Sequence, residues 1–369
     1  RHSGNRLIVG HFQWGIKFYD QDRRPKLKNK TTTCFKIAVS VGILLFLCWK
    51  ASGNNEFANV YHSEKNWDHL AAAQVLVTLG IGVSFWRWYG LVRALQLPIT
   101  LFSALRIGYI GHAFGLVSIG TFGSDAVRVF YVAKENPDQK TLAFISVFVD
   151  RLCGLLGLFI LTSAAILSFQ YLGGSEVVNS QTQLLQTVTK TVTVMTVVGL
   201  FGFASLFLLP LFEKQKWVRR LGDLRWAGPI IDKVLAAGIA YQRRPLVLLL
   251  ALLQSVLVHT LLTLSVFCVA VGLSGQHPSL GDHFILSPVA HLPNVLPLPG
   301  GIGGLEVALD DFYRAAMDQV QTSYGLIVAL GYRMETFVVA IIGIVFYLRG
   351  RGEINKIMQS QVSSVTSHD

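Results

Sequence analysis

The chain has 369 residues, of which 52% are hydrophobic and only 14% are charged, and its mean hydropathy is +0.49. Soluble domains usually carry about 25% charged residues, so this chain has too little polar surface to fold in water. The composition indicates an all-α integral membrane protein without a large soluble catalytic domain. The net charge of +11 does not indicate nucleic-acid binding, because the basic residues gather in segments between apolar stretches.

The chain begins with a polar, basic segment, residues 1–31, which we expect to be a cytoplasmic tail rather than a signal peptide. A polytopic membrane domain is expected over 32–349, followed by a polar C-terminal tail over 350–369. Crossing a hydrocarbon core of about 30 Å takes roughly 17–25 helical residues. Six apolar stretches are this long: 32–49, 70–89, 141–168, 187–211, 246–272 and 324–348.

Two further apolar stretches, 99–122 and 283–304, are interrupted by glycine and proline. The first carries Gly108, Gly111, Gly115 and Gly120, and the second carries Pro288, Pro293, Pro297 and Pro299, then Gly300, Gly301, Gly303 and Gly304. Such interruptions free backbone groups that lipid cannot satisfy. We therefore expect both stretches to be re-entrant hairpins buried against protein.

The basic residues test this topology through the positive-inside rule. With six spans and two hairpins that return to their own side, most of the 32 Lys and Arg residues fall on one side. If 99–122 crossed the membrane fully, the basic segments 123–140 and 213–244 would lie on opposite sides of it. They could lie on the same side only if the chain contained one more membrane-crossing segment. We therefore expect a protein of the plasma (inner) membrane with both termini in the cytoplasm. Segment 213–244 is expected to form amphipathic helices on the inner leaflet.

The expected topology contains an inverted pair of units, each made of a span, a broken hairpin and a second span. The hairpins share the pattern G-x-x-G-x-acid, formed by Gly120, Gly123 and Asp125 in the first and by Gly301, Gly304 and Glu306 in the second. Inverted repeats with broken helices build many transporters, with the binding site between the repeats. Chance agreement of a short pattern in a glycine-rich chain is the alternative.

Four charged residues fall near the middle of expected spans: Asp150, Arg151, Arg333 and Glu335. At 1.5 Å per residue, Asp150 and Arg333 each lie about 13 Å from the start of their helix, close to the middle of the bilayer. Charges at this depth are costly, so they should face the bundle and pair. One reading is a structural ion pair, Asp150 with Arg333 or Arg151 with Glu335. A second, compatible reading leaves one arginine free to receive a phosphate.

The glycine-rich turns are candidate anion sites. Ser124 and Asp125 are expected to cap a helix that begins there, with Arg128 in its first turn, and another helix with Glu306 in its first turn is expected after 299–304. Free N–H groups at a helix start can bind an anion. Alternatively, the glycines only permit tight turns and close packing, and the acidic residues only cap the helices.

No catalytic motif and no metal or cofactor site is visible in the sequence. His112, His259 and His291 lack metal-ligand spacing and are expected to be packed core histidines. The four cysteines lie in or beside apolar runs without a CxxC pair, so neither a disulfide framework nor a zinc site is expected. The aromatic residues of 86–89 are interpreted as an interfacial belt.

A series of motifs runs in order through roughly residues 70–350. They are Phe85-Trp86-Arg87-Trp88-Tyr89, Arg93-Ala94-Leu95, Gly123-Ser124-Asp125-Ala126-Val127-Arg128, Asp150-Arg151-Leu152-Cys153-Gly154-Leu155-Leu156-Gly157-Leu158, Leu296-Pro297-Leu298-Pro299-Gly300-Gly301-Ile302-Gly303-Gly304-Leu305-Glu306 and Gly331-Tyr332-Arg333. The series resembles the lysylphosphatidylglycerol synthase transmembrane family, the flippase-like membrane half of the bacterial multiple peptide resistance factor. The chain departs from the family pattern at 115–124, where an Asn, a Pro-Gly and a Gly-Gly-Asp are usual.

The resemblance implies a transporter that moves an anionic or modified phospholipid, or a polyprenyl-phosphate lipid, between leaflets. The alternatives are a membrane enzyme or enzyme subunit that acts on lipid head groups or lipid-linked sugars, and a structural membrane partner of a lipid-modifying enzyme. A metal-binding acidic cluster or a fused soluble domain would favour an enzyme, and neither is visible in the sequence. The aminoacyl-transfer domain of two-part family members is not seen either, so no lysyl-transferase activity is expected.

Together, the buried charges and the glycine-rich turns define the expected substrate-binding residues. They are Arg128, Arg151, Arg333, Asp125, Asp150, Gly301, Gly303, Gly304, Glu306 and Glu335. The expected partner is the lipid itself.

Overall fold

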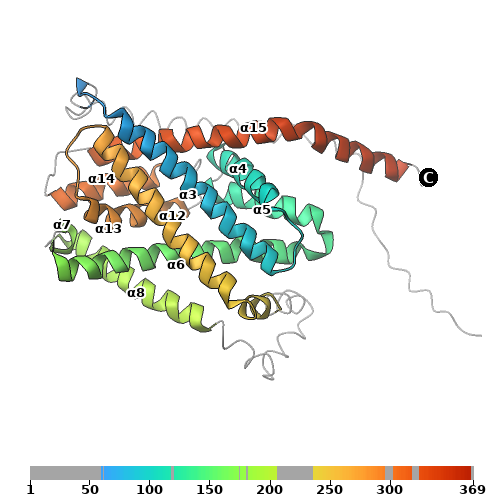
Figure 1. The fold of residues 1–369 in the computed structure, drawn as a ribbon, viewed down its shortest axis with the longest axis horizontal. Helices are drawn as coiled ribbons and strands as arrows, with labels where there is room; N and C mark the ends of the chain where they lie inside the picture. Colours follow the sequence, from blue (N-terminus) through green and yellow to red (C-terminus); the bar gives the residue numbers. More distant parts are fainter. Residues whose placement is uncertain are drawn as a thin grey trace, which may run out of the picture.

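The computed structural model describes residues 60, 62–117, 120–173, 175–179, 182–205, 236–295, 302–317 and 324–366. Most of these residues are helical, and no strand occurs among them. Five of their helices are long and apolar enough to cross a membrane: α3 (Trp67–Ala94), α6 (Lys140–Leu172), α8 (Gln183–Ser205), α12 (Pro245–Gly272) and α15 (Tyr324–Thr366) (Figure 1). The all-α membrane fold and five of the six expected spans are therefore confirmed. The sixth span, 32–49, lies outside the described residues.

Two helical hairpins stand between the spans. The first consists of α4 (Leu101–Val117) and α5 (Gly120–Glu135), and the second of α13 (Leu280–Ala290), the 3-10 turn η3 (Leu292–Val295) and α14 (Gly304–Met317). In Figure 1 the two hairpins occupy opposite halves of the bundle. Short elements, η1 (Pro137–Gln139) and α7 (Glu176–Asn179), flank α6.

The directions of the spans follow from contacts at the two ends of the bundle. Asn66 N donates to Gly272 O at 3.0 Å, which places the start of α3 beside the end of α12. Arg244 Nη1 donates to Arg93 O at 3.3 Å, which places the end of α3 beside the start of α12. The two helices are therefore antiparallel. We refer to the two ends of the bundle as the Asn66 end and the Arg93 end.

The first hairpin enters from the Arg93 end and returns to it. Helix α3 finishes at that end, and α6 starts there, where Trp88 Nε1 donates to Ser146 Oγ at 3.3 Å. Helix α6 finishes at the Asn66 end, where Phe169 packs against Gly281. Because α4 and α5 connect two helix ends on the same side, they cannot cross, and the expected re-entrant hairpin is confirmed.

The second hairpin enters from the opposite end. Helix α12 finishes at the Asn66 end, and α15 starts there, where the Tyr324 hydroxyl donates to Ala270 O at 2.6 Å. The segment α13–α14 therefore leaves the Asn66 end and returns to it. The hairpins meet inside the bundle, where Thr121 Oγ1 of α5 donates to Asn294 O of η3 at 3.2 Å.

The two units correspond element by element. Helices α3 and α12 both have 28 residues, and each is followed by a residue with a left-handed backbone, Gln96 with φ 62° and Ser274 with φ 59°. The hairpin helix α4 packs against α15 of the other unit, and α13 packs against α6. Helices α6 and α15 likewise each pack against the first span of the other unit. This correspondence indicates an inverted repeat rather than a chance pattern match.

Local sequence signals account for several helix starts. The Asn66 side chain accepts a hydrogen bond from His69 N at 3.3 Å and caps α3. Ser279 and Asp282 form a reciprocal capping box at the start of α13. Pro245 stands in the first turn of α12, where its missing N–H costs no helical hydrogen bond.

The glycines of the first hairpin do not break its helix, contrary to expectation. Helix α4 runs through Gly108, Gly111 and Gly115 and ends only at Val117. These glycines instead permit close packing: a Cβ at Gly108 would lie 2.3 Å from the Phe85 ring.

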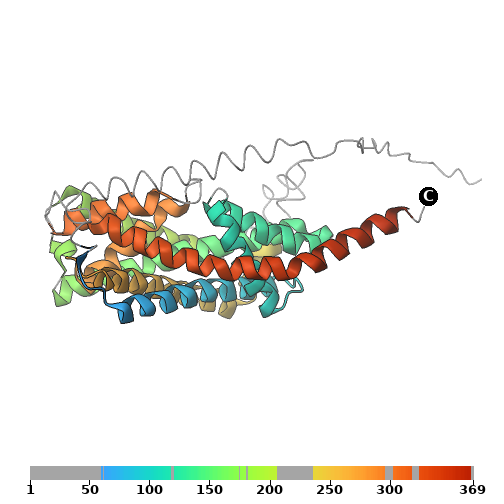
Figure 2. The same ribbon diagram turned by 90° about the horizontal axis from the view of Figure 1, so that it is seen from above.

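The last helix, α15, is longer than the expected span 324–348. The helix continues to Thr366 and projects from the bundle at the Arg93 end (Figures 1 and 2). Residues 350–366 of the expected polar tail therefore continue the last span as a helix.

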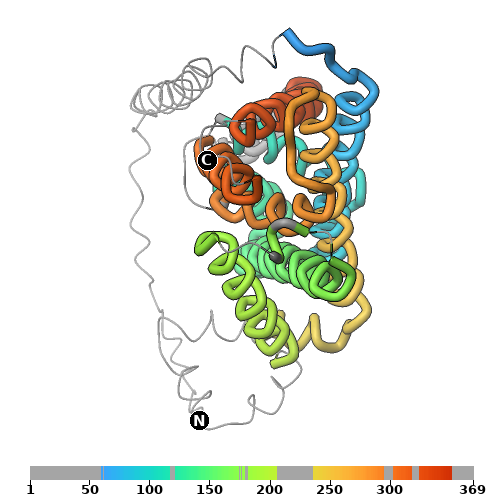
Figure 3. The backbone as a smooth tube through the Cα atoms, turned by 90° about the vertical axis from the view of Figure 1, so that its left-hand side faces the viewer, coloured from blue at the N-terminus to red at the C-terminus, as the bar shows by residue number. Residues whose placement is uncertain are grey.

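The periphery is formed by α8, which lies beside α6 in the end-on view (Figure 3). Thr196 Oγ1 of α8 contacts Phe159 O of α6 at 3.0 Å. Most other side chains of α8, including Val197 and Phe201, are exposed, as expected for a helix that faces lipid.

Labelling of single cysteines should test the hairpins, in a background with the native cysteines replaced by alanine. Gln96→Cys and Gln139→Cys flank the first hairpin and should react with an impermeant maleimide from one side. Asp68→Cys and Gln183→Cys should react from the other side, since they lie at the Asn66 end. Labelling of Gln96→Cys and Gln139→Cys from opposite sides would show that the first hairpin crosses the membrane.

Gly343 offers a packing test, because a Cβ there would lie 2.0 Å from Tyr109 O of α4. Overpacking of this kind costs typically about 1–3 kcal/mol. Gly343→Ala should therefore lower the midpoint of thermal unfolding in detergent by several degrees. Gly350→Ala is the matched control, because nothing lies within 4 Å of a Cβ at that position. Equal midpoints for the two variants would contradict close packing of α4 on α15.

Candidate functional site: a buried arginine and carboxylate network

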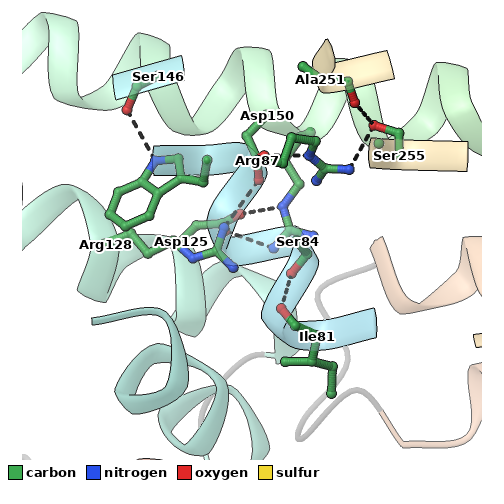
Figure 4. Close-up of polar contacts among 12 residues, drawn as sticks. Ile81, Ser84, Arg87, Asp125, Arg128, Ser146, Asp150, Ala251 and Ser255 are labelled. Atoms are coloured by element: carbon green, nitrogen blue, oxygen red, sulfur yellow. Dashed lines mark hydrogen bonds and ion pairs between the residues drawn. The ribbon is translucent and has the colours of Figure 1, made fainter. Parts of the chain in front are cut away.

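Asp150 of α6 is the centre of a buried charge cluster. Arg87 Nε of α3 lies 2.8 Å from Asp150 Oδ1, and Arg128 Nη1 of α5 lies 3.2 Å from Asp150 Oδ2 (Figure 4). The side chains of all three are at most 7% exposed. Arg87 Nη1 also donates to Ser255 Oγ of α12 at 2.8 Å. The cluster thus joins four helices in the interior of the bundle.

The cluster has an excess positive charge, and Arg128 is the more weakly bound of its two arginines. Two guanidinium groups contact one carboxylate, which leaves a net charge of one positive unit among the three side chains. The Arg128 guanidinium also lies over the rings of Phe85 and Trp88, at 4.9 and 5.4 Å from their centroids, where the aromatic faces stabilise a cation. Its Nε has no hydrogen-bond partner in the described part of the chain.

A second pair lies beside this cluster. Arg151 of α6 binds Asp125 of α5 with both arms of its fork, at 2.9 and 2.7 Å. This pair is partly accessible, with side-chain exposures of 36% for Arg151 and 21% for Asp125. The pair holds the first hairpin against the span that follows it, and its charges also act on Arg128.

The second hairpin has an equivalent pair. Arg333 of α15 contacts Glu306 Oε1 of α14 through Nε at 2.9 Å and through Nη2 at 2.8 Å. The other carboxylate oxygen of Glu306 accepts from Gly303 N at 2.9 Å. Gly303 has φ 102°, which a residue with a side chain rarely adopts. Both hairpins are thus tied to the next span by a carboxylate of the shared glycine pattern.

The net positive charge has no counterpart in the second repeat. Arg87 holds the same place in α3 as Ser265 in α12, and Asp150 precedes Arg151 as Tyr332 precedes Arg333. Arg128 follows Asp125 at the spacing at which Leu309 follows Glu306. The carboxylate–arginine tie is therefore common to both repeats, whereas the cluster around Asp150 is specific to the first.

Three histidines lie beside the network, and two of them, His112 and His259, contact helices of the other repeat. His112 of α4 lies 3.4 Å from Thr336 O of α15, and the charges of both Arg128 and Arg333 act on it. His259 Nε2 lies 3.1 Å from Gly154 O. His291 packs its ring edge against Tyr332, and its Nε2 has no partner within the described residues.

The structure contradicts the pairings expected from the sequence. Asp150 does not pair with Arg333, and Arg151 does not pair with Glu335. Each hairpin instead supplies the partner for the span that follows it, so pairing is local to a repeat. Glu335 is half-buried, and no hydrogen bond or ion pair to it occurs among the described residues.

The other expected site residues fall at or near the hairpin tips. Glu306 is in the first turn of α14, which begins at Gly304, as predicted. Ser124 and Asp125 do not cap a helix, because α5 already begins at Gly120. Gly301 lies outside the described residues. The structure thus brings Asp125, Arg128, Asp150 and Arg151 together in one group, and Glu306 and Arg333 in another.

Sequence reasoning missed Arg87 as a member of the buried network, since residues 86–89 were read as an interfacial belt. That reading is wrong for Trp88, which is fully buried. A depth comparison would have found Arg87: α3 ends at Ala94 and α6 begins at Lys140, so Arg87 and Asp150 lie at similar depths from the same membrane side.

Removal of one partner from the buried pair of Arg333 and Glu306 should lower the free energy of unfolding strongly. Arg333→Gln leaves Glu306 without its counter-ion, which typically costs about 3–5 kcal/mol, and the thermal unfolding midpoint in detergent should fall sharply. The double variant Arg333→Gln/Glu306→Gln should recover much of the loss. Arg151→Gln should cost less, since its pair is partly accessible. An equal fall in the thermal unfolding midpoint for Arg151→Gln and Arg333→Gln would show that burial of the pair does not determine the loss of stability.

Comparison with known proteins supports the relationship that the motifs suggest. The family model described as lysylphosphatidylglycerol synthase TM region matches residues 34–343, which include both hairpins and all the charged residues of the network. No curated protein and no solved structure matches the chain. Since the match covers most of the sequence, the chain belongs to the lysylphosphatidylglycerol synthase transmembrane family.

Proposed function

We propose that this protein moves a lipid with an anionic head group between the two leaflets of the plasma (inner) membrane. Its family relates it to lipid modification or transport. The single observation that carries the proposal is the excess positive charge of the buried cluster, in which the guanidinium groups of Arg87 and Arg128 share the one carboxylate of Asp150. The expected substrate class is an anionic or modified phospholipid, or a polyprenyl-phosphate lipid.

The physical difficulty of lipid transport is the head group. A phosphate in hydrocarbon loses its hydration, and an isolated buried charge is strongly unfavourable. Fixed donors can replace the lost water, and an arginine fork binds two phosphate oxygens at once. Arg128 is suited to this role for two reasons. Asp150 keeps an ion pair with Arg87 even when Arg128 binds a ligand, and Arg128 has further N–H donors that can bind phosphate oxygens.

The hairpins supply a means of access from both sides. One enters from the Arg93 end and the other from the Asn66 end, and they meet at Thr121 and Asn294. Transporters with inverted repeats place their binding site between the repeats and open it alternately to the two sides. Movement of one hairpin at a time would expose the arginine network to one leaflet at a time.

The orientation follows from the charges at the two ends. Basic residues at the Arg93 end include Arg93, Lys134, Lys140, Arg243 and Arg244. Because cytoplasmic loops carry an excess of Lys and Arg, we propose that this end faces the cytoplasm. The C-terminus, which follows α15 out of the Arg93 end, would then be cytoplasmic, and we propose the same side for the N-terminus.

A leaflet-exchange assay in proteoliposomes tests the proposal, using fluorescent anionic phospholipid and a membrane-impermeant quencher. Arg128→Gln should slow exchange by about tenfold or more, because a hydrogen bond to a charged group contributes about 1.5–3 kcal/mol. Arg128→Lys should restore only part of the rate, because lysine lacks the fork. Asp150 keeps Arg87 in both variants, so folding should be preserved.

Arg93→Gln is the matched control, because it removes an exposed arginine outside the network and should exchange lipid at the wild-type rate. Wild-type exchange by Arg128→Gln, at matched amounts of folded protein, would overturn the role of Arg128. Chemical alteration of the lipid by the purified protein, detected by mass spectrometry, would instead favour a membrane enzyme that acts on head groups.

A further inference from the structure

Glu335 is an acidic residue within the membrane that the network does not use. At 1.5 Å per residue, it lies about 16 Å along α15 from Tyr324 and about 22 Å from Gly350, the limits of the membrane-spanning part. Its neighbour Thr336 contacts His112 of the first hairpin. Glu335 therefore lies in the central part of the bundle rather than at a head-group surface.

The side chain of Glu335 stands at the border between lipid and protein. Met334 and Val338 beside it are 52% and 49% exposed, whereas Val339 is fully buried. Glu335 itself is half-buried. Glu335 thus lies on α15 between residues that face the packed interior and residues that are exposed on the lipid-facing surface.

Among the residues that the structure describes, the elements packed against α15 offer Glu335 no counter-ion. Their titratable groups in the membrane interior are Arg106, Tyr109 and His112 on α4, Glu306, Asp310 and Tyr313 on α14, His259 and Cys268 on α12, Arg87 on α3, and His291 at the end of α13, which packs against Tyr332. None of these forms a hydrogen bond or an ion pair with Glu335. The nearest arginine in sequence, Arg333, is held by Glu306.

Glu335 contrasts in this respect with the carboxylates of the network. Asp125, Asp150 and Glu306 each contact arginine at 3.2 Å or less. A charged residue without a partner at this depth is strongly unfavourable, because lipid cannot replace its hydration. A neutral carboxyl avoids most of that cost, so protonation rather than ion pairing is the means by which Glu335 can remain in this place.

We propose that Glu335 is a proton-binding site, and that proton uptake and release there are coupled to movement of the hairpins. The proton site stands on the geometry of α15 alone, whereas its coupling to lipid movement rests on the function proposed above. Glu335 lies between Arg333, which holds Glu306 of the second hairpin, and Thr336, which contacts His112 of the first. Gain or loss of a charge at Glu335 therefore changes the electrostatic environment of the contacts that α15 makes with both hairpins.

Labelling with dicyclohexylcarbodiimide tests the proton site without any transport assay. The O–H of a protonated carboxyl in an apolar setting adds across a C=N bond of the reagent. The adduct rearranges to a stable N-acylurea that retains all atoms of both reactants. Peptide mass spectrometry of the membrane-embedded protein should show this adduct at Glu335, with less adduct as the pH of labelling rises.

The paired carboxylates provide internal controls for labelling. Asp150 and Glu306 should remain unmodified, because their oxygens are bound to arginine, and Glu335→Gln should abolish the main adduct. Labelling of Asp150 or Glu306 with Glu335 unmodified, or labelling of Glu335 that does not fall as pH rises, would overturn the proton site.

Proteoliposomes with an imposed pH gradient test the coupling. In the wild type, reversal of the gradient should change the rate of lipid exchange several-fold. Glu335→Gln should be insensitive to the gradient, and Glu335→Asp should respond as the wild type does. Glu135→Gln, at the exposed end of α5, is the matched control. Gradient-independent exchange by the wild type would overturn the coupling, whereas absence of any exchange would count against the proposed function and leave the labelling result to decide on the proton site.

Discussion

The cost of a charge in hydrocarbon is the constraint on which the rest of this structure depends. The bundle places arginines and carboxylates in its interior, where each ion pair must compensate for lost hydration. Asp150 meets this requirement with two arginines, and Asp125 and Glu306 each meet it with one. Since every one of these contacts joins different helices, the charges also determine which helices lie side by side. The arrangement of the helices in this protein therefore depends on the pairing of their charges.

The same constraint accounts for the hairpins. A helix that stops inside a membrane leaves N–H and carbonyl groups that lipid cannot satisfy. Here the two tips meet each other, and Thr121 donates to the main-chain carbonyl of Asn294. Glu306 accepts from the N–H of Gly303 and at the same time binds Arg333. One carboxylate thus satisfies the start of a broken helix and the charge of a neighbouring span.

Much of the fold could be read from the sequence because hydrophobic length and the distribution of basic residues report directly on membrane crossing. The five described spans and both re-entrant hairpins follow from these two signals. The prediction that the glycines of α4 break the helix was wrong, because glycine inside a membrane helix can permit close helix packing as readily as it can break a helix. Gly108 against Phe85 is an instance.

The site was predictable only in part. The sequence identified most of the charged residues but paired them wrongly, because depth along a helix does not say which neighbour a side chain faces. Arg87 was missed because its aromatic neighbours suggested a membrane interface. The pairs Asp125 with Arg151 and Glu306 with Arg333 depend on the way each hairpin folds back on the next helix. No single-helix pattern contains that information, although the shared glycine motif marked both carboxylates.

The unequal charge of the two repeats has a consequence for direction. If the halves were identical, the states open to either side would be related by symmetry and would have equal energy in a symmetric membrane. The cluster of Arg87, Arg128 and Asp150 belongs to the first half alone, and Ser265, Leu309 and Tyr332 stand at the equivalent places. If the protein works by the alternating movement proposed above, its two open states are chemically distinct, and it has a built-in resting preference for one leaflet even where no gradient is applied.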